Sequence, residues 1–236
     1  MDAAAGSEGR PGNARAAAAR YVAIITDGNG RWARARGVPV NEGHDAGADT
    51  VKARLRDAVE LGVKELTVYS FSTENWSRPV QEVSGLIEMF SRRIARETPE
   101  LHAEGVRMRF IGRREGISES LQEQMREAQE LTDANRTITL FVAFNYGGRA
   151  EILDAAARYT GGGEEEFRRG LYAPEMHDPD LIIRTSGERR LSNYLLWQSA
   201  YSELVFRDEL WPDFTRAALE ESLAEFSARR RRFGGR

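Results

Sequence analysis

Hydrophobic residues along this chain form short β-branched runs that alternate with longer stretches in which they recur every three or four positions. The short runs predict buried strands at residues 21–25, 64–70, 106–111, 137–144, 181–183 and 204–206. The longer stretches predict helices at residues 48–59, 79–94, 117–128, 148–159 and 215–232. The glycine and glutamate run at 161–166 is expected to be a surface loop.

Regular alternation of strands and helices is typical of α/β proteins, in which helical crossovers keep the strands parallel. We therefore predict a single α/β domain, residues 21–236, with a mostly parallel central sheet of about six strands flanked by helices. The run at 137–144 is almost continuously apolar, as in a central strand that is covered on both faces. Residues 1–20, rich in alanine, glycine and arginine, are predicted to be a mobile N-terminal tail.

Composition narrows the range of partners. With 236 residues, of which 41% are hydrophobic and 30% charged, the chain has the make-up of one globular domain. A formal net charge of −3 provides no field that attracts nucleic acid, so we expect no nucleic-acid partner. The absence of cysteine excludes disulfides and thiolate metal sites and is compatible with a cytoplasmic location. No apolar run approaches the roughly 20 residues of a membrane span, so any membrane contact is expected to be peripheral.

Asp27 and the residues after it form the first candidate site, directly following the strand at 21–25. Gly28 and Gly30 allow positive φ angles and a close approach of the backbone to a ligand, and successive N–H groups in such a turn bind anions. Arg31 adds a planar fork that suits phosphate oxygens, and Asp27 can hold Mg²⁺ beside a phosphate group. Asp-Gly and Asn-Gly are equally ordinary turn dipeptides, so a plain turn also accounts for this stretch when it is read alone.

Polar residues also follow three other predicted strands, at the sheet edge where ligands of open parallel sheets bind. A single basic loop is usually only solvated, but several basic and glycine-rich loops that converge on one edge favour an anion pocket. The residues that follow the strand ends, in chain order, are Asp27, Ser72, Glu74, Asn75, Trp76, Arg78, Asn145, Gly147, Gly148, Arg149, Arg184, Ser186, Gly187, Arg190 and Ser192.

The loop after the strand at 181–183 is the second candidate site because it is rich in arginine. Arg184, Arg190 and Ser192 alternate with small residues, so the loop can wrap around a phosphate group. Arg190 and Ser192 face the same way if the chain is locally extended. The alternative is a surface loop whose arginines pair with Glu188.

The sequence pattern alone does not assign a single role to four further residues. His44 lies at a predicted helix start, where it donates a hydrogen bond to phosphate, acts as an acid or only caps the helix. Glu203 stands among apolar and small residues and is either a second metal ligand or the partner of an arginine. Trp32 and Trp76 are expected, from residue type alone, to be packing residues.

Four ordered blocks carry a family resemblance. They are residues 27–32 (DGNGRW), 71–78 (FSTENWSR), 145–149 (NYGGR) and 180–193 (DLIIRTSGERRLSN). In these blocks the chain resembles the cis-prenyltransferases, the family of undecaprenyl diphosphate synthase and its relatives. The resemblance extends over residues 21–235 and includes the C-terminal segment RRFGG at 231–235.

The resemblance implies an enzyme that adds isopentenyl diphosphate units to an allylic diphosphate, with farnesyl diphosphate as the expected primer. The implied product is a long cis-polyprenyl diphosphate such as undecaprenyl diphosphate, which serves as a cell-wall lipid carrier. Mg²⁺ is the implied cofactor, held by Asp27 with the help of Glu203. Members are typically homodimers in which the C-terminal tail reaches the neighbouring subunit's site, and the product implies peripheral membrane contact.

The same resemblance assigns roles to individual residues. Asp27 and Asn75 are implied to be catalytic, and the proton acceptor is either a diphosphate oxygen or a water linked to Asn75 and Ser72. Residues 83–94 of the predicted helix and 138–142 of the predicted strand line an apolar tunnel or only the core. The implied substrate-binding residues are Gly28, Asn29, Gly30, Arg31, Trp32, His44, Ser72, Trp76, Arg78, Arg184, Arg190 and Ser192.

The chain departs from the family pattern at several positions. The family usually has His in place of Tyr21, Met in place of Thr26, and an arginine that grips the allylic diphosphate in place of Val40. Losing one charge-assisted contact costs about 1.5–3 kcal/mol. Affinity for the allylic substrate therefore depends on whether Arg34 or Arg36 compensates for Val40.

Product length and catalytic competence are open to more than one interpretation. Ser70 is small at a position where a bulky residue shortens products, which favours a long product. Val40 and the segment at 159–179, which is shorter than in typical members, favour instead a short-chain or specialised synthase. A non-catalytic partner subunit is expected to lack the Asp-Gly-Asn corner or the basic loop, and this chain has both.

Overall fold

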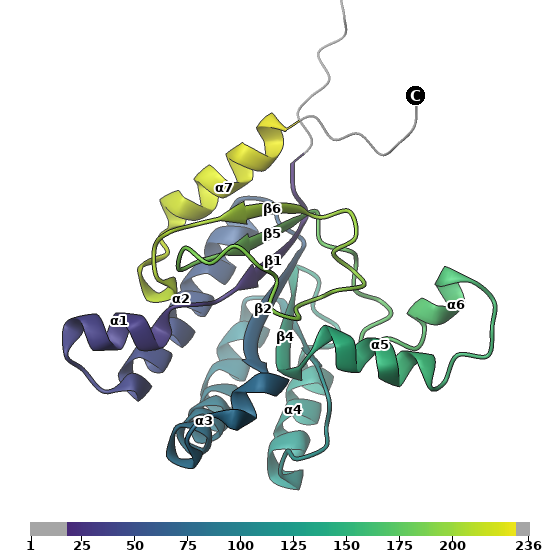
Figure 1. Cartoon of the computed structure of the whole chain (residues 1–236), viewed down its shortest axis with the longest axis horizontal. Helices are drawn as coiled ribbons and strands as arrows, with labels where there is room; N and C mark the ends of the chain where they lie inside the picture. The colour runs from purple at the N-terminus through teal and green to yellow at the C-terminus, as the bar shows by residue number, and fades with distance from the viewer. Residues whose placement is uncertain (1–17, 230–236) are drawn as a thin grey trace, which may run out of the picture.

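The computed structural model describes residues 18–229 and shows a six-stranded sheet in which all neighbouring strands are parallel (Figure 1). The strand order is β3-β4-β2-β1-β5-β6. The predicted α/β class and the parallel sheet are thus confirmed. The strands are β1 Tyr21–Ile25, β2 Glu65–Ser72, β3 Val106–Ile111, β4 Ile138–Tyr146, β5 Leu181–Arg184 and β6 Glu203–Phe206.

The long amphipathic helices lie where the pattern predicts them, but α2 begins at Val40, eight residues earlier than predicted, and α3 continues to Ala103, nine residues further. Residues 164–166 of the predicted surface loop belong to α6. α1 and α6 were not predicted, and α7 ends at Ala228 because Arg229 is extended, with φ −78° and ψ 141°. The N-terminal tail expected at 1–20 and the end of the chain lie largely outside the described residues. The helices are α1 Asn29–Arg36, α2 Val40–Glu60, α3 Val80–Ala103, α4 Glu119–Thr132, α5 Gly148–Ala156, α6 Glu164–Arg168 and α7 Arg216–Ala228, with 3₁₀ turns η1 Thr73–Ser77 and η2 Trp211–Asp213.

The order of the strands creates a crevice at the end of β1. The chain places β2, β4 and β3 on one side of β1, and then crosses over to place β5 and β6 on the other side. In parallel sheets, such a reversal of direction leaves an opening beyond the carboxyl ends of the two strands concerned. Here these are β1 and β5, which pair from Val22 with Leu181 to Ile25 with Arg184.

The two faces of the sheet are covered differently. One face packs against α2, α3, α4 and α7, through buried residues such as Leu55, Met125 and Leu219. The opposite face packs mainly against irregular chain, in which Tyr194 and Leu195 are fully buried. Figure 1 shows α1 and the α5–α6 pair projecting on opposite sides of the sheet. No helix within residues 18–229 has the length and apolar character needed to cross a bilayer.

α1 packs very closely on α2 at two glycines. A methyl group built on Gly43 would lie 2.3 Å from the backbone oxygen of Asn29, and one built on Gly47 would lie 2.4 Å from the Oδ1 atom of Asn29. The indole of Trp211 donates a hydrogen bond of 2.8 Å to the backbone oxygen of Gly47 and holds η2 against the same corner. These contacts fix the first turn of α1 beside the end of β1.

Replacing Gly43 by alanine is expected to lower the free energy of unfolding by about 1–3 kcal/mol, because the clash with the backbone of α1 outweighs the better helix propensity of alanine. Gly85→Ala in α3 is the matched control. No atom lies within 4 Å of the methyl group that it adds, so it should raise stability by about 0.5–1 kcal/mol. Urea unfolding measures both changes, and equal effects of the two variants would contradict the close packing of α1 on α2.

Candidate active site

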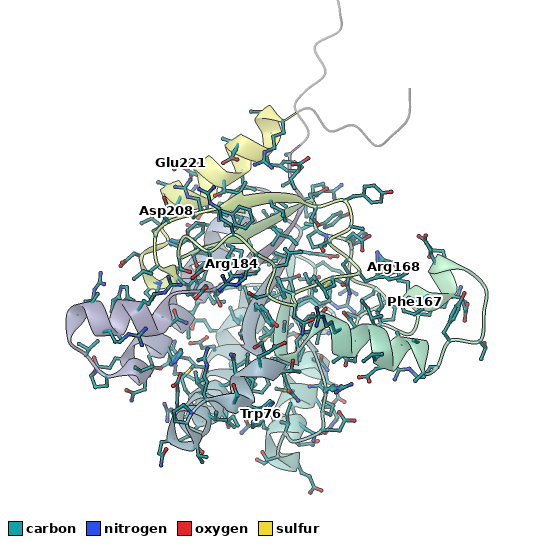
Figure 2. All side chains as sticks on the ribbon, in the orientation of Figure 1. Trp76, Phe167, Arg168, Arg184, Asp208 and Glu221 are labelled. Atoms are coloured by element: carbon teal, nitrogen blue, oxygen red, sulfur yellow. The ribbon has the colours of Figure 1, made fainter. Side chains whose placement is uncertain are left out.

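Asp27 lies in the crevice between the ends of β1 and β5. Its Oδ1 atom accepts a hydrogen bond from Arg31 at 3.3 Å and its Oδ2 atom accepts one from Arg184 at 2.9 Å. The hydroxyl of Thr185 donates to the backbone oxygen of Asp27 at 2.7 Å. Figure 2 shows Arg184 near the centre of the molecule. Burial raises the pKa of Asp27, but hydrogen bonds from Arg184 and Ser186 and the charges of both arginines outweigh it, so this pKa lies below its ordinary value.

The first turn of α1 supplies backbone donors beside Asp27. Gly28 has φ 116°, which a residue with a side chain rarely adopts, whereas Gly30 lies inside α1 without a positive φ. Of the two glycines that allow a positive φ, only Gly28 therefore adopts one. The first hydrogen bond of the helix runs from the N–H of Trp32 to the oxygen of Gly28, at 2.8 Å. The N–H groups of residues 28–31 precede it and have no acceptor within the helix, which suits an anion.

Arg184 is the buried cation of the site, with a side chain only 4% exposed. Its Nη1 atom donates to the backbone oxygen of Arg190 at 2.5 Å and to the hydroxyl of Ser192 at 2.6 Å. The side chain of Arg190 is 60% exposed and pairs with Glu188 at 2.5 Å. The alternative, an exposed arginine paired with Glu188, thus describes Arg190, and the wrapping of the loop around a phosphate group stays a prediction.

Backbone strain is concentrated in the loop that follows β5. Asn193 anchors this loop through three contacts: its Nδ2 atom donates to Glu74 at 2.8 Å, its Oδ1 atom accepts from the N–H of Arg149 at 2.8 Å, and its backbone oxygen accepts from the N–H of Gly148 at 2.7 Å. Strain of this kind persists only where the surroundings enforce it, and it is common at binding sites. The non-glycine residues of the loop with positive φ are Ser186 (76°), Ser192 (47°), Asn193 (63°) and Leu195 (45°).

The segment after β2 forms another wall of the crevice. Asn75 accepts a hydrogen bond from the N–H of Ser72 at 3.0 Å, in a reciprocal capping arrangement that fixes the turn η1. The indole of Trp76 donates to the side chain of Asn145 at 2.7 Å. Asn145 also has a positive φ, of 51°, and it is the residue before the last one of β4. The structure therefore brings the ends of β2 and β4 together through these two side chains.

His44 is a partly buried imidazole near the same wall. Its Nε2 atom lies 3.6 Å from Glu82, which also pairs with Arg78 at 3.0 Å. Burial, together with the charge of Arg78, lowers the pKa of His44 below its ordinary value. Among the described residues, the buried Nε2 atom has no hydrogen-bond partner, and neither has Oδ1 of Asn29. The Nε atom of Arg184 is also buried without a partner, so three unpaired polar atoms of the described residues lie in or next to the crevice.

An apolar pocket continues from Asn29 and His44 between α2, α3 and the sheet. Its mostly apolar lining with a few polar groups is typical of small-molecule sites. Of the residues expected to line a tunnel, Phe90, Ile94 and Val142 do so, whereas Val83 packs into the core. The rings of Phe71, Phe90 and Phe144 stack on one another at one side of it. An anion site and a hydrocarbon pocket therefore adjoin.

Comparison with known proteins decides the family. A family model described as "Putative undecaprenyl diphosphate synthase" matches residues 25–234. An isoprenyl transferase of Thermotoga maritima is 51% identical over 225 residues, which cover 92% of this chain and 97% of that protein. Isoprenyl transferase 2 of Bradyrhizobium diazoefficiens is 50% identical over 94% of this chain and 92% of that protein. The chain belongs to the undecaprenyl diphosphate synthase family. It is a prenyltransferase, as the sequence motifs implied.

Solved structures of prenyl diphosphate synthases share the fold. The crystal structure of lavandulyl diphosphate synthase from Lavandula x intermedia, in complex with dimethylallyl diphosphate, has a TM-score of 0.88 and 34% identity, with 92% of this chain and 99% of that chain covered. The crystal structure of a probable undecaprenyl diphosphate synthase from Campylobacter jejuni has a TM-score of 0.79 and 29% identity, with the same coverage.

Two residues that the family resemblance assigned to the site lie elsewhere in this prenyltransferase. The indole of Trp32 donates to Asp213 at 2.8 Å and is covered by Arg36, so Trp32 packs α1 against η2. Glu203 begins β6 and pairs with Arg229 at 2.7 Å. It lies at the amino end of its strand, roughly 10 Å of strand rise from the edge that holds Asp27. Within one chain, Glu203 therefore cannot share a metal ion with Asp27, because the two residues lie at opposite ends of the sheet.

Sequence reasoning missed several residues that shape this site. Thr185 locks the backbone of Asp27, Asn193 anchors the strained loop, and Asn145 holds Trp76. The sequence places Asn145 at the end of a predicted strand and Asn193 in a motif block, without assigning either side chain a role. The available signal was chemical: asparagine tolerates positive φ better than other residues with side chains, so an asparagine just after a strand indicates a sharp turn.

Asp27→Asn is expected to lower the free energy of unfolding by about 1.5–3 kcal/mol at neutral pH, because it leaves the buried Arg184 without a charged partner. Since the pKa of Asp27 is lower in the folded chain, this contribution is fully present above the pKa of an unfolded aspartate, about 3.9. It is lost as the pH falls through the lower folded pKa. Urea unfolding of wild type and variant from pH 7 down to pH 3 measures the difference.

Asp213→Asn is the control for this prediction. Asp213 also pairs with an arginine, Arg36, but both side chains are more than 40% exposed. Removing its charge should change stability by less than about 1 kcal/mol. A pH-independent difference between wild type and Asp27→Asn would show that the Asp27 carboxylate is not held in its charged form by the arginines.

Proposed function

We propose that this prenyltransferase condenses isopentenyl diphosphate with an allylic diphosphate in a Mg²⁺-dependent reaction. Farnesyl diphosphate is the primer. The product is a long cis-polyprenyl diphosphate such as undecaprenyl diphosphate. One observation carries the proposal: Asp27 stands between Arg31 and Arg184 beside an apolar pocket. Such a site binds a charged diphosphate and a hydrocarbon chain at once.

The allylic diphosphate binds at the first turn of α1 in this proposal. The free N–H groups of residues 28–31 and the guanidinium of Arg31 contact its oxygens, and neutral His44 donates one more hydrogen bond. Its hydrocarbon part extends past Asn29 into the apolar pocket, which the side chains of both Asn29 and His44 line. The geometry thus orients the diphosphate toward Asp27 and the chain away from it.

Isopentenyl diphosphate binds at the loop after β5. The terminal nitrogens of Arg184 already donate to Asp27 and Ser192, whereas the side chain of Arg190 is exposed and pairs, among the described residues, with Glu188. A diphosphate with two or more negative charges competes well with one exposed carboxylate for Arg190. Ser72, Asn75 and Arg78 lie between the two diphosphates and orient the reacting carbons.

Asp27 is the residue that fits a metal ion. Among residues 18–229, no group of three or more acidic or histidine side chains could enclose a cation. Mg²⁺ commonly takes one or two protein carboxylates and completes its shell with phosphate oxygens and water, which Asp27 and a bound diphosphate provide. When bound there, Mg²⁺ neutralises charge that develops on the departing diphosphate. We assign this contact to Asp27 alone, without Glu203.

The reaction needs charge stabilisation more than acid–base chemistry. The allylic C–O bond breaks and its electron pair leaves with the diphosphate, whose new charge is met by Arg31 and the N–H groups of α1. The double bond of isopentenyl diphosphate forms the new C–C bond, and one proton is then lost. A diphosphate oxygen or a water held by Asn75 and Ser72 accepts that proton.

A short-chain or specialised synthase is the second candidate. The TM-score is 0.88 with lavandulyl diphosphate synthase and 0.79 with the Campylobacter protein. In addition, the allylic site has Val40 in place of an arginine. A relative from Thermobifida fusca, 48% identical, is named a trans,polycis-polyprenyl diphosphate synthase specific for (2Z,6E)-farnesyl diphosphate. Product length separates the two candidates. Homodimer formation is also proposed and is measured by light scattering of the purified chain.

We expect the wild-type protein to form long polyprenyl products from farnesyl diphosphate, labelled isopentenyl diphosphate and Mg²⁺. The Asp27→Ala variant should form at least about 100-fold less product, because the site loses its metal contact. Chromatography that resolves products by length measures both. Products that stop after one or two additions would identify the short-chain synthase. No product with farnesyl, geranyl or dimethylallyl primers would contradict the proposal and favour a partner subunit.

Arg34 is placed to compensate for Val40. A methyl group built on Gly30 would lie 3.5 Å from Nη1 of Arg34 and 3.9 Å from Cγ1 of Val40. Arg36 is occupied by Asp213 and Trp32, whereas Arg34 forms no ion pair with any described residue. We therefore assign the missing cation of the allylic site to Arg34.

Arg34→Ala is expected to raise the KM for the allylic diphosphate about tenfold and to leave the KM for isopentenyl diphosphate unchanged, because one exposed charge-assisted contact is lost. Arg36→Ala is the matched control on the same helix and should change neither KM by more than about twofold. Steady-state kinetics with each substrate varied in turn measures the effect. A rise in both KM values, or in neither, would contradict the role of Arg34.

A further inference from the structure

Asn193 joins three segments that follow three different strands of the sheet. It lies in the loop after β5, which reaches across to the start of α5 (Figure 1). Its Nδ2 atom donates to Oε1 of Glu74, in the turn η1 after β2, at 2.8 Å. Its Oδ1 atom accepts from the N–H of Arg149, and its backbone oxygen accepts from the N–H of Gly148, both at the start of α5 after β4. We call these three contacts the Asn193 clamp.

The space around the clamp admits no further side chain. A methyl group built on Gly147 would lie 2.6 Å from Oγ1 of Thr73 and 2.8 Å from Nδ2 of Asn193. One built on Gly148 would lie 3.1 Å from the backbone oxygen of Asn193. The glycine pair after β4 thus leaves the room that Asn193 needs to reach η1. The positions of η1, of the loop after β5 and of the start of α5 therefore depend on one another.

The clamp holds the loop in a strained conformation. Ser192 and Asn193 have φ angles of 47° and 63°, a region that asparagine tolerates better than serine does. In this conformation the hydroxyl of Ser192 and the backbone oxygen of Arg190 both lie within 2.6 Å of Nη1 of Arg184. Because Arg190 is only three residues before Asn193, the clamp also determines where the exposed side chain of Arg190 leaves the backbone.

The other end of the clamp is a charged carboxylate in η1. Burial raises the pKa of Glu74, but hydrogen bonds from Asn193 and other nearby groups outweigh it, so this pKa lies below its ordinary value. The hydroxyl of Thr73 donates to the second carboxylate oxygen, Oε2, at 3.2 Å. A hydrogen bond from an amide to an ionised carboxylate is stronger than one between neutral groups. Glu74 directly precedes Asn75, so a shift of Glu74 also moves Asn75.

We propose that Asn193 is a positioning residue for isopentenyl diphosphate, because its clamp to Glu74 fixes the loop that binds the diphosphate relative to the turn that orients the reacting carbons. This inference rests on the proposed function. Asn193 itself needs no contact with the substrate. It acts through Arg190 on one side and through Asn75 on the other, and the glycine pair after β4 keeps the space between them open.

The first experiment exchanges the groups of the two partners. Asn193→Asp keeps the shape of the side chain and the acceptor for the N–H of Arg149, but it places a second carboxylate against Glu74, and like charges at this distance repel. We expect the KM for isopentenyl diphosphate to rise about tenfold and the KM for the allylic diphosphate to change less than about threefold. Adding Glu74→Gln supplies an amide donor to the new carboxylate. It should bring the KM back to within about threefold of wild type.

Two further variants separate the clamp from backbone strain and from general stability. Asn193→Gly adopts the positive φ without strain but removes the side chain, so we expect it to raise the same KM. Asn135→Asp is the matched control. The Nδ2 atom of Asn135 donates to the backbone oxygens of His102 and Val106, next to the amino ends of β3 and β4 and therefore at the opposite edge of the sheet. This variant should lower stability and change neither KM by more than about twofold.

Binding of isopentenyl diphosphate provides a readout that needs no turnover. Calorimetric titration is carried out with Mg²⁺ present and with the allylic site filled by farnesyl thiodiphosphate, whose C–S bond resists cleavage. The Kd should follow the KM: about tenfold weaker in Asn193→Asp and recovered in the double variant. Should Asn193→Asp fold poorly, Glu74→Ala removes the same hydrogen bond at an exposed residue and should weaken binding in the same way.

The outcomes separate this inference from the proposed function. An unchanged KM and Kd in Asn193→Asp, a wild-type KM in Asn193→Gly, or no recovery in the double variant would overturn the clamp and leave the prenyl transfer intact. An equal rise in both KM values would also overturn it, because the whole site would then be disturbed. The expected pattern of Kd values in a chain that condenses no primer would support the clamp and overturn the proposed reaction. No binding of isopentenyl diphosphate by wild type would overturn both.

Discussion

The ion pair between Arg184 and Asp27 is the interaction on which the site depends. It joins the ends of β1 and β5, which are adjacent in the sheet but far apart in the sequence. Asp27, Ser192 and the backbone oxygen of Arg190 accept hydrogen bonds from both terminal nitrogens of this guanidinium, which is only 4% exposed, whereas its Nε atom has no hydrogen-bond partner among the described residues. The loop after β5 must curl back to bring these oxygens to Arg184. The positive φ angles of Ser192 and its neighbours are the conformational cost of satisfying that buried charge.

The same pair prepares the site for anions. Arg31 contacts Asp27 and also donates twice to Ser186, so the guanidinium planes of two arginines are oriented before any substrate arrives. Rigid, preoriented donors stabilise charge that develops during a reaction without first having to reorganise. The close packing of Gly43 on Asn29 fixes the first turn of α1, and therefore fixes Arg31 as well. Packing between α1 and α2 and the ion pairs at the sheet edge thus hold the same side chains, Asp27 and Arg31, in position.

Sequence patterns predicted the sheet well because its strands are short apolar runs that are buried on both faces, β4 above all. They predicted the long helices because α2, α3 and α4 each have one apolar face. α1 and α6 were missed since they are short and polar, and they form only against other parts of the fold. The site was predicted in outline because parallel topology gathers strand ends at one edge. The correction for Glu203 has the same origin: it lies at the start of β6, whereas the other candidates lie at strand ends.

The side-chain pairs could not be predicted, because a pairing depends on which helices become neighbours. Arg92 and Arg93 look alike in the sequence, yet one pairs within α3 and the other crosses to α2. The difference follows from one step of about 100° around a helix of 3.6 residues per turn. That step sends Arg92 outward into water and Arg93 over the apolar pocket. The sequence specifies that both residues are charged, but only the packing of α2 against α3 determines that Arg93 pairs across the two helices and lines the pocket.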